Sequence, residues 1–347
     1  MSPLILTTLL LGLGLGTTIT FASSHWLLAW MGLEINTLAI LPLMAQHHHP
    51  RAIEATTKYF LTQATAAAML LFASTTNAWL TGQWNIYQMT HPFSTTLVLL
   101  ALALKIGLAP MHSWLPEVLQ GLNLTTGLIL STWQKLAPFA LILQIQPDTP
   151  LLVILGLTST LVGGWGGLNQ TQLRKVLAYS SIAHLGWMMV VLQFSPSLTL
   201  LTLLIYLIMT SATFLTFKLN KTTNINTLAT SWSKNPTLTT LTPLVLLSLG
   251  GLPPLTGFMP KWLILQELTK QNLALVATMI ALSALLSLYF YLRLSYAMTL
   301  TMSPNNLTGI TPWRLPSPQL TLHLSLSIST TILLLPLTPL ISTIMTP

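Results

Sequence analysis

Five ionisable side chains lie inside apolar stretches of this sequence. Glu34, Lys105, Lys135, His184 and Lys261 each fall within or at the edge of a run of apolar residues long enough to cross a membrane. A lysine at the centre of such a helix costs about 2.5 to 3.5 kcal/mol on insertion scales. Facing lipid, the five together would cost on the order of 10 kcal/mol. We therefore expect them to face protein or water inside a bundle of helices.

These residue types are suited to proton transfer. Lysine, glutamate and histidine bind and release protons, which arginine does not do in proteins. Because a nearby carboxylate stabilises an ammonium group, a changing distance between Glu34 and Lys105 would load or release a proton. His112 and His184 titrate nearer neutrality and suit relay positions. Two plainer interpretations stay open, namely a static Glu34–Lys105 ion pair and histidines that only bond neighbouring helices.

Two proline-containing stretches interrupt the apolar runs and carry several of these residues. They are Lys105–Glu117 and Gly251–Lys261, and their glycine, leucine and proline positions coincide at an offset of 251 − 107 = 144 residues. Proline removes a backbone donor and clashes with the preceding turn, so both stretches predict broken helices. Broken helices at corresponding places in two halves of a chain are the best sequence indication of a transport site.

The composition indicates an integral membrane protein. Hydrophobic residues make up 52% of the chain and charged residues 5%, whereas soluble domains have about 25% charged residues. Apolar runs of about 20 residues recur, and the alternation typical of barrel strands is absent. We expect a single all-α polytopic membrane domain over residues 1–347, with about eleven transmembrane helices.

The broken segments are the fourth and ninth of these expected spans. Because the two are five spans apart, an odd number, the second must run opposite to the first. The sequence therefore predicts two inverted five-helix repeats, residues 1–145 and 150–300, followed by a loop and a peripheral C-terminal helix within 301–347. Glu34 and Lys105 align with apolar residues of the second repeat, so the charged chemistry of the halves differs.

The loops carry most of the basic residues on one side of the membrane. Nine fall on the side of the N-terminus, and Lys270 alone falls on the other. This asymmetry predicts that the N-terminus faces the cytoplasm-equivalent side and that the C-terminus lies across the membrane. The nine are Arg51, Lys58, Arg174, Lys175, Lys218, Lys221, Lys234, Arg293 and Arg314.

Several other function classes are disfavoured. The chain has no cysteine, which excludes disulfides, iron–sulfur ligation and thiol catalysis within it. Its net charge of +8 comes from scattered residues, so nucleic-acid binding is not expected. The loop histidines 47–49 are not expected to hold a metal, and no redox cofactor ligand set is visible. Gly163–Gly167 lacks the context of a phosphate loop and predicts close helix contacts instead.

Several long motifs together resemble the antiporter-like membrane subunits of NADH:ubiquinone oxidoreductase, respiratory complex I. The resemblance covers essentially the whole chain. It is carried by Ser24–Leu27 together with Glu34, and by Lys105–Glu117, Thr132–Pro138, Gly163–Lys175, Ala178–Gly186 and Gly250–Lys261.

The resemblance implies a proton-conducting subunit of the mitochondrial inner membrane, with its N-terminus in the matrix and its C-terminus in the intermembrane space. Other subunits would hold NADH, FMN, iron–sulfur clusters and ubiquinone, and this chain would bind no cofactor. Its partners would be lipids and other membrane-arm subunits, further antiporter-like ones included, rather than copies of itself. Family roles fall on the coupled pair Glu34 and Lys105, on the central relay Lys135, and on Lys261 towards the exit half-channel. The two histidines named above also match motif positions.

Two rival functions remain compatible with the sequence. An independent cation/proton antiporter would exchange ions as an isolated chain in liposomes. A purely structural spacer between active subunits would tolerate loss of Lys105, Lys135 and Lys261 without loss of pumping.

Overall fold

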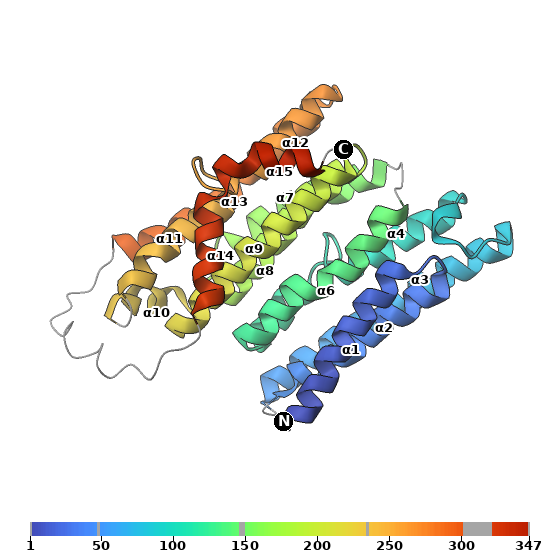
Figure 1. Cartoon of the computed structure of the whole chain (residues 1–347), viewed down its shortest axis with the longest axis horizontal. Helices are drawn as coiled ribbons and strands as arrows, with labels where there is room; N and C mark the ends of the chain where they lie inside the picture. Colours follow the sequence, from blue (N-terminus) through green and yellow to red (C-terminus); the bar gives the residue numbers. More distant parts are fainter. Residues whose placement is uncertain (1, 47–48, 146–149, 234–235, 301–320, 346–347) are drawn as a thin grey trace. The chain divides into compact units, whose positions relative to one another are not determined.

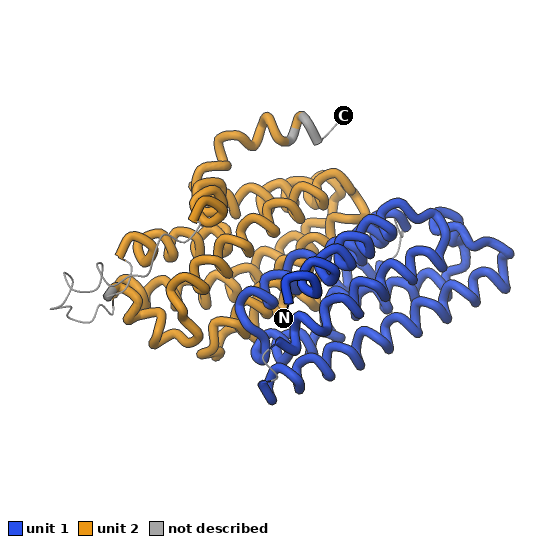
Figure 2. Tube along the Cα trace, turned by 60° about the horizontal axis from the view of Figure 1, so that its bottom comes forward, with its two compact units in different colours: residues 1–155 blue, residues 156–347 orange. Residues whose placement is uncertain are grey.

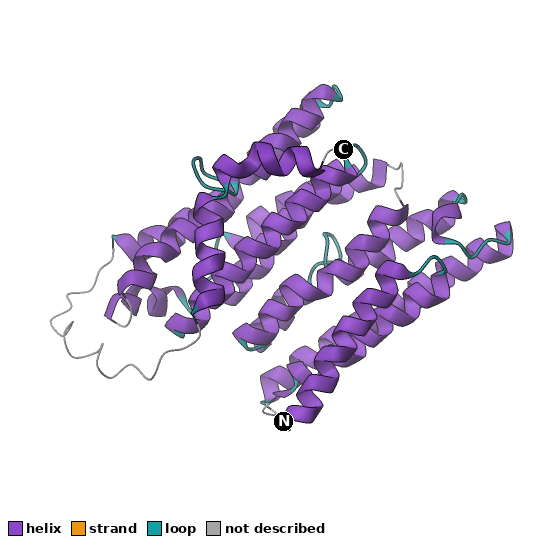
Figure 3. Ribbon diagram, viewed as in Figure 1, coloured by secondary structure: helices purple, strands orange, loops and turns teal. Residues whose placement is uncertain are grey.

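The computed structural model describes residues 2–46, 49–145, 150–233, 236–300 and 321–345. Helices make up their regular structure, and no strand occurs among these residues (Figures 1 and 3). The α-helices are α1 (Pro3–Ala22), α2 (Trp26–Met44), α3 (Pro50–Thr81), α4 (Pro92–Ile106), α5 (Trp114–Gly121), α6 (Leu124–Ile145), α7 (Pro150–Gly167), α8 (Leu173–Leu192), α9 (Pro196–Asn220), α10 (Ile225–Ala229), α11 (Pro236–Gly250), α12 (Phe258–Lys270), α13 (Ala274–Thr299), α14 (Leu322–Leu333) and α15 (Thr338–Met345).

A few of the sequence-based expectations concern residues outside these ranges. They are the loop within 301–320 with Arg314, the expectation that His47 and His48 hold no metal, and the side of the membrane on which Lys234 lies.

Membrane-crossing helices dominate the described residues. Seven are long and apolar enough to cross a membrane, and an eighth span results if the bent pair Leu322–Leu333 and Leu335–Ile341 is counted as one. The chain is therefore an all-helical, polytopic integral membrane protein, as its composition predicted. The seven are α1, α2, α6, α7, α8, α9 and α13.

Local sequence sets where many helices begin and end. Proline occupies the first positions of α1, α3 and α4, where its missing N–H would have no helical partner anyway. Helix α3 ends at Gly82, whose φ of 72° lies in the left-handed region that glycine adopts without a Cβ penalty.

The chain forms two compact units, residues 1–155 and 156–347, and the boundary falls within α7 (Figure 2). In unit 1, α2 packs between α1 and α3, α3 packs against α4 and α5, and α6 packs against α1, α2 and α4 (Figure 1). In an apolar stretch of 18 residues, half of the residues of α2 are buried but only 22% of those of α1. Helix α2 is thus more deeply buried in unit 1 than α1.

Helix α8 is the centre of unit 2, since 83% of the residues in its 18-residue apolar stretch are buried. It packs against α9, α12 and α13. The glycine-rich end of α7 makes close contacts, as the sequence predicted. A Cβ at Gly163 would lie 2.7 Å from the backbone nitrogen of Ala183 in α8, and one at Gly164 would lie 2.9 Å from Cβ of Leu286 in α13.

A break separates α4 from α5 in unit 1. Gly107 follows α4 with a φ of 85°, and the N–H groups of Gly107 and Leu108 both donate to the carbonyl of Ala103 at 2.9 Å. These bonds close the helix. A cis Ala109–Pro110 bond follows, and Trp114 then begins α5.

A second break, between α11 and α12 in unit 2, has the same local structure. Helix α11 ends at Gly250, and Gly251 follows with a φ of 79°. The N–H groups of Gly251 and Leu252 both donate to the carbonyl of Leu247, at 3.1 and 3.3 Å. A cis Pro253–Pro254 bond lies inside the break.

The C-terminal helix α14 packs on unit 2 against α9 and α11. Its Leu324 and Ile328 belong to a buried apolar cluster with Ala212 and Val245. Beyond Leu333 the chain bends by 67° before the short helix α15.

Candidate functional site

A small cavity inside unit 1 brings together two predicted site residues, Lys105 and Lys135. It offers about 20 Å³ to the centres of water molecules, and roughly 10 to 15 Å³ by this measure accommodates one water. Side chains from α2, α3, α4, α5 and α6 form its wall. Beside the two lysines, the lining residues that carry side-chain hydrogen-bonding groups are Asn36, Thr37, Tyr59, Gln63, Trp114 and Gln134.

Lys105 lies in the last turn of α4 and is 6% exposed. Its Nζ is buried and has no hydrogen-bond partner in the described part of the chain. Because the helix breaks after Ile106, the carbonyl groups of Leu104 and Lys105 have no N–H donor from a following helical turn. Two side chains occupy them instead, since Trp114 Nε1 donates to the carbonyl of Leu104 at 3.1 Å and Gln63 Nε2 to that of Lys105 at 3.4 Å.

Lys135 lies in the interior of α6 and is 2% exposed. It reaches the same cavity as Lys105 from a different helix. Pro138, less than one turn further on, also lines the cavity. Its ring nitrogen carries no hydrogen, so the backbone beside Lys135 lacks one helical hydrogen bond. An ammonium group, a polar lining and a weakened helix thus meet at one point.

The carboxylate of Glu34 lies outside the cavity wall, midway along α2. The ion pairs within 4.0 Å in the described residues do not include Glu34 with Lys105. Glu34 still interacts electrostatically with Lys105 and with Tyr59. Its Oε2 is buried and has no hydrogen-bond partner among the residues described. The structure therefore has the two charged groups apart rather than in contact.

Lys261 belongs to unit 2 and lies in the first turn of α12. Its Nζ donates a 2.6 Å hydrogen bond to the carbonyl of Gly250, the last residue of α11. The same Nζ lies 6.0 Å from the ring centroid of Trp187, at the outer limit of a cation–π contact. A Cβ at Gly251 would lie 2.8 Å from Cδ of Lys261, so the glycine also leaves room for this side chain.

Neither predicted histidine lines the unit 1 cavity. His112 is half-buried in the first break, and its Nδ1 lies 3.2 Å from the carbonyl oxygen of Pro110. His184 belongs to α8 of unit 2, where its ring centroid lies 5.7 Å from that of Tyr206. The structure thus brings Lys105 and Lys135 into one cavity with Glu34 within electrostatic reach, and it leaves both histidines elsewhere.

Sequence reasoning missed the neutral polar residues of the cavity. Gln134 Nε2 donates to the backbone carbonyl of Asn36 at 3.3 Å, and both polar side-chain atoms of Asn36 are buried without a partner in the described residues. Tyr59 and Gln63 lie four residues apart in α3, and this spacing places both on one helix face. That spacing is the signal in the sequence by which these two residues could have been found.

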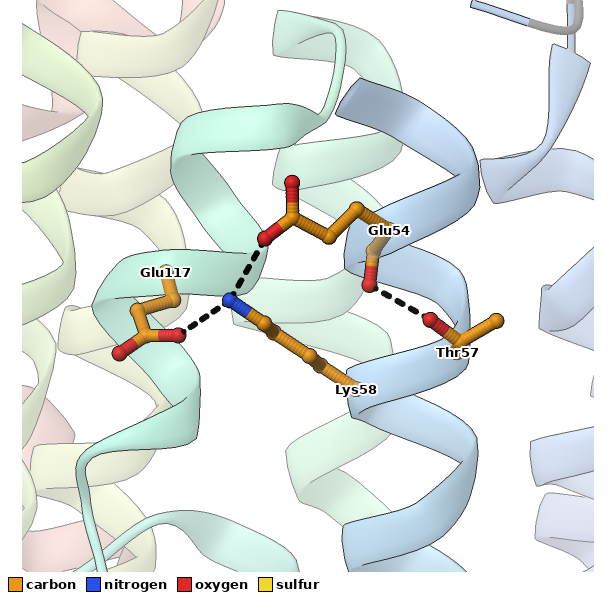
Figure 4. Close-up of polar contacts among 4 residues, drawn as sticks. All are labelled: Glu54, Thr57, Lys58 and Glu117. Carbon is orange, nitrogen blue, oxygen red and sulfur yellow. Dashed lines mark hydrogen bonds and ion pairs between the residues drawn. The ribbon is translucent and has the colours of Figure 1, made fainter. Parts of the chain in front are cut away.

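An exposed ion cluster ties α5 to α3 at the start of α3 (Figure 4). Lys58 Nζ lies 2.8 Å from a carboxylate oxygen of Glu54 and 2.8 Å from one of Glu117. The hydrogen bond from Lys58, and then its charge, lower the pKa of the Glu54 carboxyl. The hydrogen bonds to Glu117 and Glu54 raise the pKa of Lys58. The cluster holds α5, and with it Trp114, against α3.

Metal and cofactor ligation were not predicted for this chain. The described residues contain no group of three or more His, Cys, Asp or Glu that would hold a metal ion.

Two family models match this chain along most of its length. One, described as the transmembrane region of NADH:quinone oxidoreductase and Mrp antiporters, matches residues 23–287. The other, described as the C-terminus of NADH dehydrogenase subunit 2, matches residues 288–342.

Curated relatives of high identity share a single name. NADH-ubiquinone oxidoreductase chain 2 of Tetraodon nigroviridis is 77% identical over 340 residues, which cover 98% of each chain. The protein of the same name from Salmo salar is 72% identical over 348 residues and covers 100% of both.

Solved structures share the fold. A chain of respiratory complex I from Thermus thermophilus superposes with a TM-score of 0.84 at 30% identity, covering 97% of this chain and 78% of that one. A chain of the Mrp complex from Dietzia superposes with a TM-score of 0.79 at 19% identity, covering 86% of this chain and 60% of that one. The second likeness concerns the fold alone.

Proposed function

From the premise that this chain belongs to the family of NADH-ubiquinone oxidoreductase chain 2, we propose that it moves protons through the cavity that Lys105 and Lys135 share. Membership makes it an antiporter-like, proton-translocating subunit of the membrane arm of that enzyme. We assign NADH, FMN, the iron–sulfur clusters and ubiquinone to other subunits, whose redox chemistry drives this one.

One observation carries the proposal. Two buried lysines from different helices line one cavity that has room for water and a wall rich in amide and hydroxyl groups. Each buried polar group without a partner costs free energy. A space that served packing alone would therefore be lined by apolar side chains. Water in the cavity would satisfy Lys105 and Asn36 and would join Lys105 to Lys135 by hydrogen bonds along which a proton moves.

Glu34 is the element that makes this transfer respond to the rest of the enzyme. At 4 Å and an effective dielectric constant of 20, a carboxylate and an ammonium group attract by about 4 kcal/mol. That energy changes a proton equilibrium by roughly a thousandfold. When charge movement in a neighbouring subunit draws Glu34 towards Lys105, the protonated lysine is stabilised, and when Glu34 withdraws, the proton is free to move on to Lys135.

The later steps of the relay are an extension from the sequence. We propose that the proton passes from Lys135 to Lys261, the residue towards the exit half-channel. His184 would contribute in unit 2, and His112 would serve the first break. The support is that Lys261 lies at the second break, with its ammonium group at the carboxyl end of a half-helix.

We also propose eleven membrane spans arranged as two inverted five-helix repeats, 1–145 and 150–300. To the seven long helices and the bent C-terminal pair, this count adds α3 and the two broken pairs, α4 with α5 and α11 with α12. The support for the repeat is local. The closing hydrogen bonds, the left-handed glycines and the helix starts of the two breaks all occur at an offset of 144 residues, as in Gly107 and Gly251.

The same proposal places the protein in the mitochondrial inner membrane. The loop charges favour the N-terminus in the matrix and the C-terminus in the intermembrane space. Its partners would be lipids and other membrane-arm subunits, antiporter-like ones among them, in line with solved relatives that are chains of multi-subunit complexes. Association with a second copy of itself is not part of the proposal.

Replacement of Lys135 with Met in the assembled enzyme tests the function. K135M removes the titratable group and keeps a side chain of similar length, so we expect proton movement to fall while electron transfer by detergent-solubilised enzyme continues. The measurements are NADH oxidation and the number of protons pumped per electron in proteoliposomes.

The matched control is K270M, because Lys270 is an exposed lysine paired with Glu267 at 3.6 Å. We expect its pumping stoichiometry to equal that of the unmodified enzyme. Full stoichiometry in K135M would refute the relay role, and full stoichiometry after loss of Lys105, Lys135 and Lys261 together would favour the structural spacer. Ion exchange by the isolated chain in liposomes would favour the independent antiporter.

A further inference from the structure

A buried hydrogen bond joins the second break to the C-terminal helix of unit 2. The hydroxyl of Thr256 donates to the backbone carbonyl of Thr331 at 2.6 Å. Thr256 is 2% exposed and Thr331 is 1% exposed. Most other threonine hydroxyls in the described residues donate to a carbonyl three or four positions earlier in their own helix. This one spans 75 residues and connects two separate elements.

The sequence around Thr331 explains why its carbonyl is available. Helix α14 ends at Leu333, and Pro336 follows within the bend of 67°. In a continuing helix the Thr331 carbonyl would accept from the N–H of Leu335, but the proline that follows Leu335 does not continue the helix. The carbonyl of Thr331, in the last turn of α14, therefore needs a donor from outside the helix. Buried carbonyl groups are satisfied by protein donors or by ordered water, and here Thr256 supplies the donor.

Thr256 also helps to start the helix that carries Lys261. Its backbone carbonyl accepts from the N–H of Met259 at 3.2 Å, which anchors the first turn of α12. Lys261 lies in that turn and reaches back to the carbonyl of Gly250 at 2.6 Å. Next to Thr256, Gly257 packs directly on the backbone carbonyl of Ser248, where a Cβ would not fit. The segment between the half-helices is thus held on one side by α11 and on the other by α14.

We propose that the Thr256–Thr331 hydrogen bond is a latch by which the C-terminal helix α14 holds the second break in the conformation that places Lys261 at the end of α11. Thr256 is accordingly a positioning residue, which acts on the relay through Lys261 without contacting the proton path. The inference rests on the proposed function for the role of Lys261, but the hydrogen bond and its effect on the break do not depend on it.

The matched position of the first break carries a different residue type. The residue at the matched position, 144 residues earlier, is His112, which is half-buried and whose Nδ1 lies near the Pro110 carbonyl of its own break. The two breaks therefore share their glycine and proline framework and differ in the residue at the position of Thr256. Dependence on α14 is a property of the second break.

The test compares T256V with T256S in the assembled enzyme. Valine keeps the shape of threonine and removes the donor, whereas serine keeps the donor. We expect T256V to raise deuterium uptake several-fold in peptides covering 251–261 and 328–337, and to lower the number of protons pumped per electron. T256S should have the deuterium uptake and the pumping stoichiometry of the unmodified enzyme. If T256V does not assemble, T256C takes its place, because a thiol is similar in size to the hydroxyl group but a much weaker hydrogen-bond donor.

The matched control is T202V in α9. Thr202 is 4% exposed, and its hydroxyl donates at 2.8 Å to Thr199 within the same helix, so neither readout should change. Unchanged uptake in T256V would overturn the latch, and increased uptake with unchanged pumping would overturn the positioning role. K261M is measured beside them. Full pumping in K261M would refute its place in the relay, whereas the uptake of T256V would still decide whether the latch exists.

Discussion

Lys261 donates a 2.6 Å hydrogen bond to the carbonyl of Gly250, the last residue of α11. In unit 1 the ammonium group beside the break comes from Lys105, which lies within the last turn of α4 itself. Both breaks therefore place a lysine at the carboxyl end of the preceding half-helix, where the helix dipole favours a positive charge. One lysine belongs to that half-helix and the other to the half-helix that follows. The same electrostatic arrangement thus arises from different sequence positions.

Gly251→Ala should disturb the position of Lys261. The φ of 79° is unfavourable for alanine, and the new Cβ would lie 2.8 Å from Cδ and 2.9 Å from Nζ of Lys261. We expect a cost of about 1–2 kcal/mol from the backbone alone, together with reduced pumping. G82A is the control, because Gly82 has a φ of 72° and no atom within 4 Å of an added Cβ. Thermal unfolding and pumping stoichiometry measure both effects, and equal pumping in the two variants would contradict the prediction.

Lys105→Met and Lys261→Met should differ in stability although both lose proton movement. K105M removes a buried group that has no hydrogen-bond partner in the described chain, so we expect an unchanged or higher unfolding temperature. K261M leaves the Gly250 carbonyl without its donor, which costs about 1–3 kcal/mol where the group stays buried. Thermal unfolding of the purified enzyme distinguishes them. A larger loss of stability in K105M than in K261M would show that Lys105 has a partner in the working enzyme.

Trp114→Phe should weaken the first break while preserving the cavity wall. The indole N–H donates to the carbonyl of Leu104 at 3.1 Å, and phenylalanine keeps an aromatic ring but no donor. We expect a loss of about 1 kcal/mol and a partial fall in pumping, because the carbonyl lies next to Lys105. W79F is the control, since Trp79 is 88% exposed. Identical behaviour of the two variants would argue against this support of α4.

Lys58→Met should reveal an ion cluster whose contribution is constant around neutral pH. Lys58 lowers the pKa of Glu54 from its ordinary value of 4.5, so the stabilisation is present above that value and is lost as pH falls through the folded pKa. The pKa of Lys58 is raised above 10.5, so its contribution is present below that value and is lost at higher pH. The difference in unfolding temperature between K58M and the unmodified enzyme should be flat from about pH 6 to 9.

The same difference should shrink as pH falls towards 4, because the Glu54 carboxylate begins to be protonated. It should also shrink at high salt, because exposed charges are screened. Hydrogen exchange of residues 113–121 should rise in K58M, since the cluster joins Glu117 of α5 to α3. A stability difference that grows on acidification would contradict the assigned pairing.

Local chemistry made much of the architecture predictable. Long apolar runs without charge become membrane helices because each backbone polar group must be satisfied inside its own segment. Glycine and proline at 107–116 and 251–260 end and restart helices because of their own φ preferences and missing donors. The sequence by itself marked Lys105, Lys135 and Lys261 as functional candidates, because burying a lysine in a membrane helix is costly. These inferences depend only on a residue and its close neighbours in the chain.

Only the tertiary structure decided which candidates meet. Lys105 and Lys135 share a cavity while Glu34 stays outside its wall, and Tyr59, Gln63 and Asn36 complete the polar lining. Thr256 bonds a carbonyl that is freed 75 residues away. These relationships join helices that are distant in sequence. Their distances depend on how side chains pack and on which carbonyl groups a break leaves free, and no local pattern encodes that.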